Sequence, residues 1–159
     1  MIESNALSLT YPDGTEALSD VNLRIPHGSL VYIVGVSGSG KTSLLKLLMG
    51  METPSSGILK VDGFPMGHLT RDGKQKLRQR IGPIFQGFRL IPGKTALENV
   101  LIGLRFLDLS HKAMLGAAQE ALDAVGLADK MQVDVSKLSF GQAQRVAIAR
   151  AVARGPRLI

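Results

Sequence analysis

Cysteine and tryptophan are both absent from this chain of 159 residues, which has only five phenylalanines and two tyrosines. The lack of cysteine excludes disulfides and thiolate metal sites, and it is typical of a reducing compartment. Aromatic residues are too few, and too scattered among the basic ones, for a base-stacking platform, so no nucleic acid partner is expected. No apolar run approaches the roughly 20 residues that span a bilayer, and no signal-peptide pattern is visible.

Acidic residues are missing from the C-terminal part of the chain. Asp134 is the last of them, and five basic residues follow it: Lys137, Arg145, Arg150, Arg154 and Arg157. This imbalance contributes to the formal net charge of +6. If the natural chain continues into an acidic segment, part of the excess is an effect of truncation, so we do not interpret the charge as a sign of nucleic-acid binding.

The remaining composition, 45% hydrophobic and 20% charged, is typical of one soluble globular domain. The turn residues Tyr11–Gly14 predict a hairpin between two strands, and the apolar run within His27–Val36 predicts a strand buried on both faces. Further strands are expected at Ile58–Gly63, at Arg80–Gln86 and, beginning, at Arg157–Ile159. Apolar spacing predicts helices at 42–50, Thr95–Leu107, His111–Gly126 and Ser139–Pro156.

A glycine-rich loop, Gly35–Thr42, lies between the buried strand and a helix. In the pattern Gly-x-x-x-x-Gly-Lys-Thr, successive backbone N–H groups form an anion-binding nest, and the helix dipole points at the phosphates. Lys41 reaches the β- and γ-phosphates, and the Thr42 hydroxyl ligates Mg²⁺. A chance glycine-rich turn is the alternative, but a random chain of this length matches the pattern less than about one time in a hundred. The residues predicted to bind the nucleotide here are Gly35, Ser37, Gly38, Ser39, Gly40, Lys41, Thr42 and Ser43.

The loop alone does not separate kinases, GTPases, motors and transport ATPases. The absence of an Asn-Lys-x-Asp segment makes a GTPase less favoured. A second motif, Leu138–Gln142 (LSFGQ) followed by AQRVAIARA, comes about 100 residues later. It resembles the signature of the ATP-binding cassette (ABC) ATPases, usually Leu-Ser-Gly-Gly-Gln, with Phe140 in place of the first glycine.

The signature residues Ser139, Gly141 and Gln142 are retained. A hydroxyl and free N–H groups at a helix N-terminus form a second γ-phosphate site, and one chain cannot place both sites on the same ATP. The resemblance therefore implies a head-to-tail dimer, in which each signature caps the nucleotide of the partner. The alternative is an ordinary helix with Ser139 as its N-cap.

Two further residues acquire roles from the resemblance. Gln86 is similar to the catalytic glutamine of the Q-loop, which contacts Mg²⁺ or the attacking water and couples the nucleotide to the membrane partner; otherwise it is a polar residue at a strand end. Tyr11 is similar to the aromatic residue that stacks on adenine; otherwise it packs on its own hairpin. The basic stretch Arg71–Arg80 is interpreted as a solvated helix face or, less favoured, as a contact with a membrane subunit or lipid surface.

The resemblance covers essentially the whole chain. It implies an α/β fold: a P-loop NTPase core of ABC type with an antiparallel β subdomain and a helical subdomain at roughly 90–140, in one domain, 1–159, that is truncated at its C-terminus. It also implies an ATPase that uses ATP and Mg²⁺. Its implied partners are a second nucleotide-binding subunit and an integral membrane transporter subunit. The protein would then be cytoplasmic and peripheral on the inner face of the cell membrane.

The family's Walker B aspartate and catalytic glutamate have no counterpart in this chain. The switch histidine has none either, because His27, His68 and His111 all precede the signature. We therefore expect this chain to bind ATP but to hydrolyse it poorly, and to expose an apolar sheet edge that lowers its solubility. A soluble ABC ATPase without a membrane partner and a non-hydrolysing regulatory module remain alternatives. The transported molecule and its direction stay open.

Overall fold

The structure, a computed structural model, describes residues 1–159 and divides into two compact units, Met1–Arg78 and Gln79–Ile159. The expected single domain with a helical subdomain near residues 90–140 stays a prediction. No helix of either unit has the length and apolar character that crossing a membrane requires.

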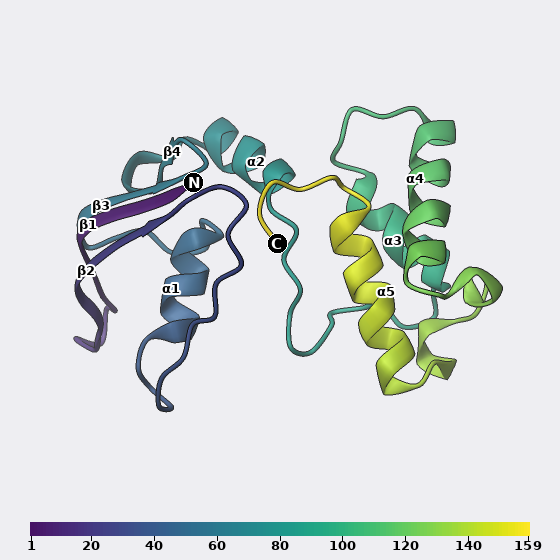
Figure 1. The fold of residues 1–159 in the computed structure, drawn as a ribbon, viewed down its shortest axis with the longest axis horizontal. Helices are drawn as coiled ribbons and strands as arrows, with labels where there is room; N and C mark the ends of the chain where they lie inside the picture. The colour runs from purple at the N-terminus through teal and green to yellow at the C-terminus, as the bar shows by residue number, and fades with distance from the viewer. The chain divides into compact units, whose positions relative to one another are not determined.

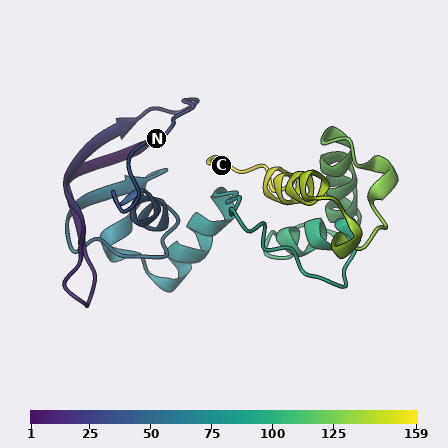
Figure 2. The same cartoon turned by 90° about the horizontal axis from the view of Figure 1, so that it is seen from below.

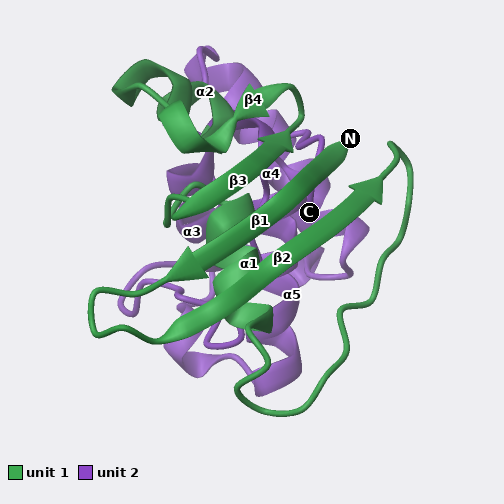
Figure 3. Ribbon diagram, turned by 90° about the vertical axis from the view of Figure 1, so that its left-hand side faces the viewer, with its two compact units in different colours: residues 1–78 green, residues 79–159 purple.

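The first unit contains a four-stranded antiparallel sheet in the order β2-β1-β3-β4 (Figure 3). The strands are β1 (Ile2–Thr10), β2 (Glu16–Ile25), β3 (Ser56–Val61) and β4 (Phe64–Pro65). The predicted hairpin is confirmed: the Gly14 N–H donates to the Tyr11 carbonyl at 2.9 Å, closing the turn between β1 and β2. Asp62 and Gly63, with φ of 47° and 84°, form the tight turn between β3 and β4 that positive φ angles favour.

Helix α1 (Lys41–Leu48) lies against one face of this sheet (Figures 1 and 3). Its buried residues are Leu44, Leu47 and Leu48, whereas Leu45, which the apolar spacing also assigns to the packed face, is 46% exposed. The helix ends at Leu48 with Met49 as its C-cap, and Gly50, the expected stop, follows with a φ of 65° that suits glycine. A short 3₁₀ helix, η1 (Met66–His68), and helix α2 (Arg71–Arg80) follow β4, and Leu77 is the buried residue of the otherwise polar α2.

The prediction of a buried strand within His27–Val36 is wrong. Residues 26–36 form no strand, and Leu30 and Val34 are 82% and 86% exposed. A strand needs a neighbouring backbone to take up its N–H and C=O groups. No segment of the chain pairs with this run, and the sheet consists of β1 to β4 alone.

The predicted strand at Arg80–Gln86 is also wrong over most of its length, because α2 continues to Arg80. Only Ile81 pairs with another segment, in an isolated parallel bridge to Leu158. The Gly82 N–H donates to the Leu158 carbonyl at 2.8 Å, and the Arg157 N–H donates to the Arg80 carbonyl at 2.8 Å. The strand expected to begin at Arg157–Ile159 is therefore reduced to this one bridge.

The second unit is a cluster of three helices, α3 (Ala96–Leu104), α4 (His111–Ala124) and α5 (Phe140–Val152) (Figures 1 and 2). Short 3₁₀ helices η2 (Ala128–Lys130) and η3 (Val135–Lys137) connect α4 to α5. All three predicted helices are confirmed, and the α4 stripe contributes Ala118, Ala121 and Leu122 to the core. The core consists of Ala96, Leu97, Val100, Leu104, Ala118, Ala121, Leu122, Leu127, Val135, Val146 and Ala149.

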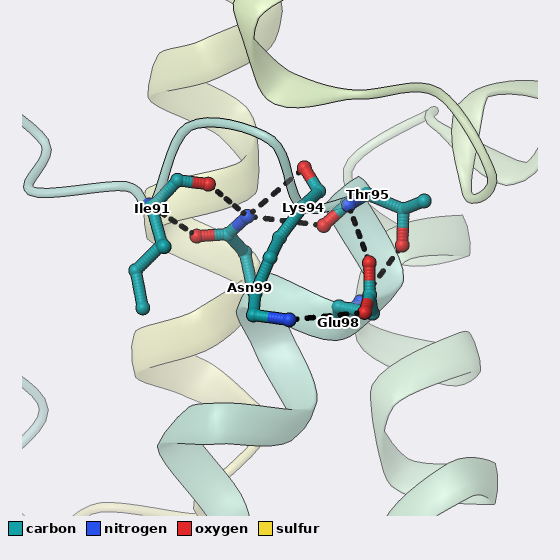
Figure 4. Close-up of polar contacts among 5 residues, drawn as sticks. All are labelled: Ile91, Lys94, Thr95, Glu98 and Asn99. Atoms are coloured by element: carbon teal, nitrogen blue, oxygen red, sulfur yellow. Dashed lines mark hydrogen bonds and ion pairs between the residues drawn. The ribbon is translucent and has the colours of Figure 1, made fainter.

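The start of α3 is fixed by two side chains (Figure 4). Thr95 and Glu98 form a capping box: the Thr95 Oγ1 accepts from the Glu98 N–H at 3.1 Å, and the Glu98 Oε2 accepts from the Thr95 N–H at 2.8 Å. The fully buried Asn99 accepts from the Ile91 N–H at 2.7 Å and donates to the Thr95 carbonyl at 3.0 Å. Asn99 thereby anchors the turn that precedes the helix.

Candidate functional site

The glycine-rich loop enters α1 at Gly40, and this position accepts only glycine. Gly40 is the N-cap of α1 with φ of 80°, a left-handed conformation that other residues adopt at a cost. A Cβ here would collide with the carbonyl oxygen of Ala17 and lie 2.8 Å from Cδ2 of Leu18. Gly38 also has a positive φ, of 82°, but a Cβ there would meet nothing within 4 Å. Close contact with β2 therefore explains why glycine is needed at position 40. At position 38 only the left-handed backbone conformation favours glycine.

The N-terminus of α1 has no side-chain cap. The first N–H groups of a helix have no acceptor within it, and they carry the positive end of the helix dipole. Helices α3, α4 and α5 differ from α1 in this respect. Their N-termini are capped by the side chains of Thr95, Ser110 and Ser139. The start of α1 thus offers uncapped donors and a positive potential, which is what a bound phosphate requires.

Lys41 adds a full positive charge at the same place. Its Nζ donates to the carbonyl oxygens of Gly35 at 2.8 Å and Val36 at 2.6 Å, and to Oγ of Ser39 at 3.3 Å. The lysine therefore holds the loop together and keeps its ammonium group within it. Thr42, the next residue, is exposed. The structure has no cluster of three or more His, Cys, Asp or Glu residues that could hold a metal ion.

Tyr11 extends from the end of β1 toward α1. Its hydroxyl lies 3.1 Å from Oγ of Ser43, and Nζ of Lys46 lies 5.7 Å from the centre of its ring. The backbone of Tyr11 forms the hairpin turn, but its side chain contacts the helix that follows the phosphate loop. The structure thus brings Tyr11 and Ser43 together with the loop; adenine stacking by Tyr11 stays a prediction.

The signature residues begin α5 in the second unit. Oγ of Ser139 accepts from the Gln142 N–H at 3.3 Å, and Oε1 of Gln142 accepts from the Ser139 N–H at 2.9 Å, forming a capping box. A hydroxyl that accepts a hydrogen bond still has its own proton to donate. Gly141 lies in the first turn, and a Cβ there would meet nothing within 4 Å. Packing within this chain therefore gives no reason for a glycine at this position.

Gln86 lies in an irregular segment after α2, and its side chain is exposed. Gln86 and Gly87 are the central residues of a turn in which the Phe88 N–H donates to the Phe85 carbonyl at 2.9 Å. Arg150 of α5 donates to the carbonyls of Phe88 and Arg89. The ring of Phe88 lies 4.8 Å from the ring of Phe140, between centroids. The structure therefore brings the Gln86 segment and the signature into direct contact.

Three residues that shape these segments carry little or no signal in the sequence: Phe88, Asn99 and Arg150. Asn99 interrupts an apolar helix face at a polar position, which is a weak signal of a buried polar group. Arg150 is one of several arginines in an alanine-rich helix, and nothing local distinguishes it. Phe140 was noted as a departure from the signature, but not as the partner of Phe88.

Comparison with known proteins agrees with this arrangement. A protein-family model described as "ABC transporter" matches residues 18–159. The chain is 40% identical to the methionine import ATP-binding protein MetN of Helicobacter hepaticus, over 100% of this chain and 45% of that protein. It is 38% identical to the phosphonates import ATP-binding protein PhnC 3 of Halalkalibacterium halodurans, over 100% of this chain and 65% of that protein. The chain spans about half to two thirds of the length of these relatives.

Solved structures give the same result. The chain matches a dimeric structure of MJ0796, a bacterial ABC transporter cassette, with a TM-score of 0.86 and 38% identity, over 98% of this chain and 71% of that one. It matches cbiO1 from Clostridium perfringens, part of the ABC transporter complex cbiONQ, with a TM-score of 0.87 and 32% identity, over 98% and 62% of the two chains. The fold is that of an ATP-binding cassette, so the predicted fold class is confirmed. The chain belongs to the ABC transporter family.

Proposed function

We propose that this chain binds MgATP through its glycine-rich loop and is the ATP-binding part of a transport ATPase. The uncapped start of α1, with Gly40 at its N-cap and the Lys41 ammonium beside it, is the observation that carries the proposal. The residues that would hold the phosphates are Gly35, Ser37, Gly38, Ser39, Gly40, Lys41, Thr42 and Ser43. Bound ATP would supply the phosphoanhydride bond whose hydrolysis releases free energy, and Mg²⁺ would neutralise its phosphate charge.

Each side chain has a limited task in this proposal. Thr42 offers its exposed hydroxyl to Mg²⁺. Tyr11 offers a flat ring to adenine, a contact worth about 1–3 kcal/mol for a stacked base. Gln86 would contact Mg²⁺ or the attacking water. All three residues lie on the surface or at its edge, where a ligand can reach them.

The signature would act on a nucleotide held by a second subunit in a head-to-tail dimer. Ser139 keeps a hydroxyl proton to donate, and Gly141 leaves open space in front of the first turn of α5. A glycine in a helix costs up to about 1 kcal/mol relative to alanine. A nucleotide that approaches from outside the chain would use the space that Gly141 leaves open. A dimeric post-hydrolysis structure of the ATP-binding cassette MJ0796 bound to ADP and Pi, which this chain matches with a TM-score of 0.85, supports the dimer but does not specify its head-to-tail arrangement.

We infer further that the complete protein hydrolyses ATP to power transport, together with an integral membrane subunit, at the inner face of the cell membrane. The curated relatives above are named import proteins, which favours import. One is named for methionine and the other for phosphonates at similar identity, so no single solute is favoured. A soluble ABC ATPase without a membrane partner is the second candidate, favoured only if the protein is active without membranes.

The 159-residue chain itself is proposed to hydrolyse ATP slowly. It has no carboxylate after Asp134, and so none in the position after the signature from which the family's glutamate polarises water. A non-hydrolysing regulatory module would show the same behaviour in this chain. Steady-state phosphate release by the chain that is lost in Lys41→Ala would contradict slow hydrolysis.

Titration calorimetry of the chain with MgATP tests the binding proposal. We expect Lys41→Ala to weaken binding by at least tenfold, about 1.4 kcal/mol. Lys60→Ala is the matched control, since Lys60 is an exposed lysine on β3 of the same unit, and it should bind like the parent. Circular dichroism confirms that each variant is folded. No binding by the parent at millimolar MgATP, or equal binding by Lys41→Ala, would overturn the proposal.

A further inference from the structure

The segment that carries Gln86 has a strained backbone. Phe88 and Arg89, two and three residues beyond it, have φ of 52° and 49°. Residues other than glycine adopt this left-handed conformation at a cost of roughly 1–2 kcal/mol each. Two such residues in succession persist only where surrounding contacts hold them.

Arg150 of α5 supplies the first of these contacts. Its Nη1 donates to the Arg89 carbonyl at 2.8 Å, and its Nη2 donates to the Phe88 carbonyl at 2.5 Å. The guanidinium is planar, so its two bonds orient both carbonyls at once. Burial lowers the pKa of Arg150, but the guanidinium stays charged at neutral pH, which strengthens both bonds.

Space for Arg150 depends on a glycine of another helix. A Cβ at Gly103 of α3 would lie 2.9 Å from Cγ of Arg150 and 3.3 Å from its carbonyl oxygen. Any larger residue would displace the arginine stem or α5 itself. Gly103 thus lets α3 and α5 approach closely enough for the guanidinium to reach the two carbonyls.

Aromatic rings supply the second set of contacts. The rings of Phe88 and Phe140 lie 4.8 Å apart at 57°, a tilted geometry that aromatic pairs favour. The guanidinium of Arg89 lies 4.1 Å from the centre of the Phe85 ring. Phe140 occupies the signature position where the motif usually has glycine, which has no ring to offer. This direct side-chain contact therefore depends on the residue that departs from the motif.

We propose that Arg150, together with the Phe88–Phe140 pair, is a positioning device that holds the Gln86 segment in one conformation and joins it to the signature at the start of α5. Arg150 is a positioning residue: its contacts are the carbonyls of Phe88 and Arg89. The role for nucleotide chemistry rests on the proposed function, because it requires that Gln86 and the signature act on ATP. The contact between the Gln86 segment and α5 does not depend on the proposed function.

The experiment uses amide hydrogen exchange and a single fluorophore. Because the chain has no tryptophan, Phe140→Trp places one reporter against Phe88. In this background we expect Arg150→Ala to speed exchange at the Phe88 and Arg89 amides at least tenfold and to lower the fluorescence anisotropy of the tryptophan, because its contact with Phe88 loosens. Arg150→Lys, which keeps the charge but not the fork, should restore part of the protection.

Arg145→Ala is the matched control. Arg145 also lies on α5, and its Nη1 donates to the Val125 carbonyl at 3.1 Å, away from Gln86. A general loss of stability would affect both arginine variants alike, whereas positioning predicts a change at Phe88 and Arg89 only for Arg150. Gly103→Ala gives an independent measurement if Arg150→Ala fails to fold, because it displaces the arginine and keeps its charge; the same local loosening is expected.

Equal exchange at Phe88 and Arg89 in the Arg150 and Arg145 variants would overturn the proposal, as would unchanged exchange in Gly103→Ala. MgATP titration of the same proteins separates this failure from that of the proposed function. If the parent does not bind MgATP but Arg150 still protects the two amides, the proposed function fails and the positioning device stands. If MgATP binds and exchange at the two amides does not depend on Arg150, the positioning device fails and the proposed function stands.

Discussion

Two glycines in the second unit permit a direct test of the signature. Gly141 lies in the first turn of α5, and Gly116 lies in the interior of α4. A Cβ at either position would meet nothing within 4 Å, so alanine fits both sites in this chain. The substitutions Gly141→Ala and Gly116→Ala are therefore sterically equivalent within the chain, and they differ in what each would meet outside it.

Both changes should stabilise the fold. Replacing glycine by alanine in a helix interior gains about 0.8–1.0 kcal/mol, which applies to Gly116. Gly141 is the second residue of its helix, where the gain is smaller, so we expect about 0.5 kcal/mol there. For a chain of this size about 1 kcal/mol corresponds to roughly 2–4 °C in Tm. Differential scanning calorimetry should therefore show a rise of about 2–4 °C for Gly116→Ala and about half of it for Gly141→Ala.

Only Gly141→Ala should weaken assembly. If the backbone at Gly141 approaches the nucleotide of a second subunit, a methyl group blocks that approach and costs a charge-assisted hydrogen bond of about 1.5–3 kcal/mol. ATP-dependent dimerisation, measured by analytical ultracentrifugation with and without MgATP, should then weaken by at least about tenfold. Gly116→Ala should dimerise like the parent. Equal dimerisation of the two variants, both stabilised as expected, would refute the reasoning that the open space at Gly141 serves a partner.

Three further predictions concern the fold. Gly40→Ala forces a left-handed alanine against Ala17 and should cost about 2–4 kcal/mol in urea unfolding, more than Gly38→Ala, which has open space. Asn99→Ala leaves the Ile91 N–H without its acceptor and should cost about 2–3 kcal/mol in the same assay. The hydrogen bond from the Thr95 N–H lowers the pKa of the Glu98 carboxyl below 4.5. The ionised Glu98 therefore stabilises the fold above pH 4.5, and this stabilisation is lost as the pH falls through the lowered pKa. When Tm is measured from pH 6 to 3, Glu98→Gln should lack this part of the acid sensitivity.

Local patterns predicted the elements whose stabilising contacts are local in sequence. The helix predicted at Thr95–Leu107 follows from the apolar spacing of its own residues, and the capping box found at the start of α3 also joins residues that are close in sequence. The hairpin follows from Tyr11–Gly14 for the same reason, since its closing bond joins residues within the turn. The glycine pattern of the phosphate loop is local as well, and in the structure Gly38 and Gly40 have left-handed conformations.

Elements that depend on distant partners could not be predicted in this way. The apolar run at 30–36 has the composition of a buried strand, but a strand forms only beside another backbone, and none pairs with this run. The conformation of Phe88 and Arg89 depends on Arg150, about 60 residues away. No pattern within Arg80–Gln86 reports on that arginine, so the segment resembled a strand that the structure does not contain.

The signature shows why a structural role and a functional role need not be alternatives. Ser139 was expected either to cap its helix or to bind phosphate, and in the structure it caps α5 by accepting from the Gln142 N–H. That bond uses a lone pair of the hydroxyl and leaves its proton free, while the capping box holds the side chain in one rotamer at the helix N-terminus. A donor fixed in place loses less conformational entropy when it binds a ligand. The cap therefore prepares Ser139 for the phosphate contact that we propose, rather than competing with it.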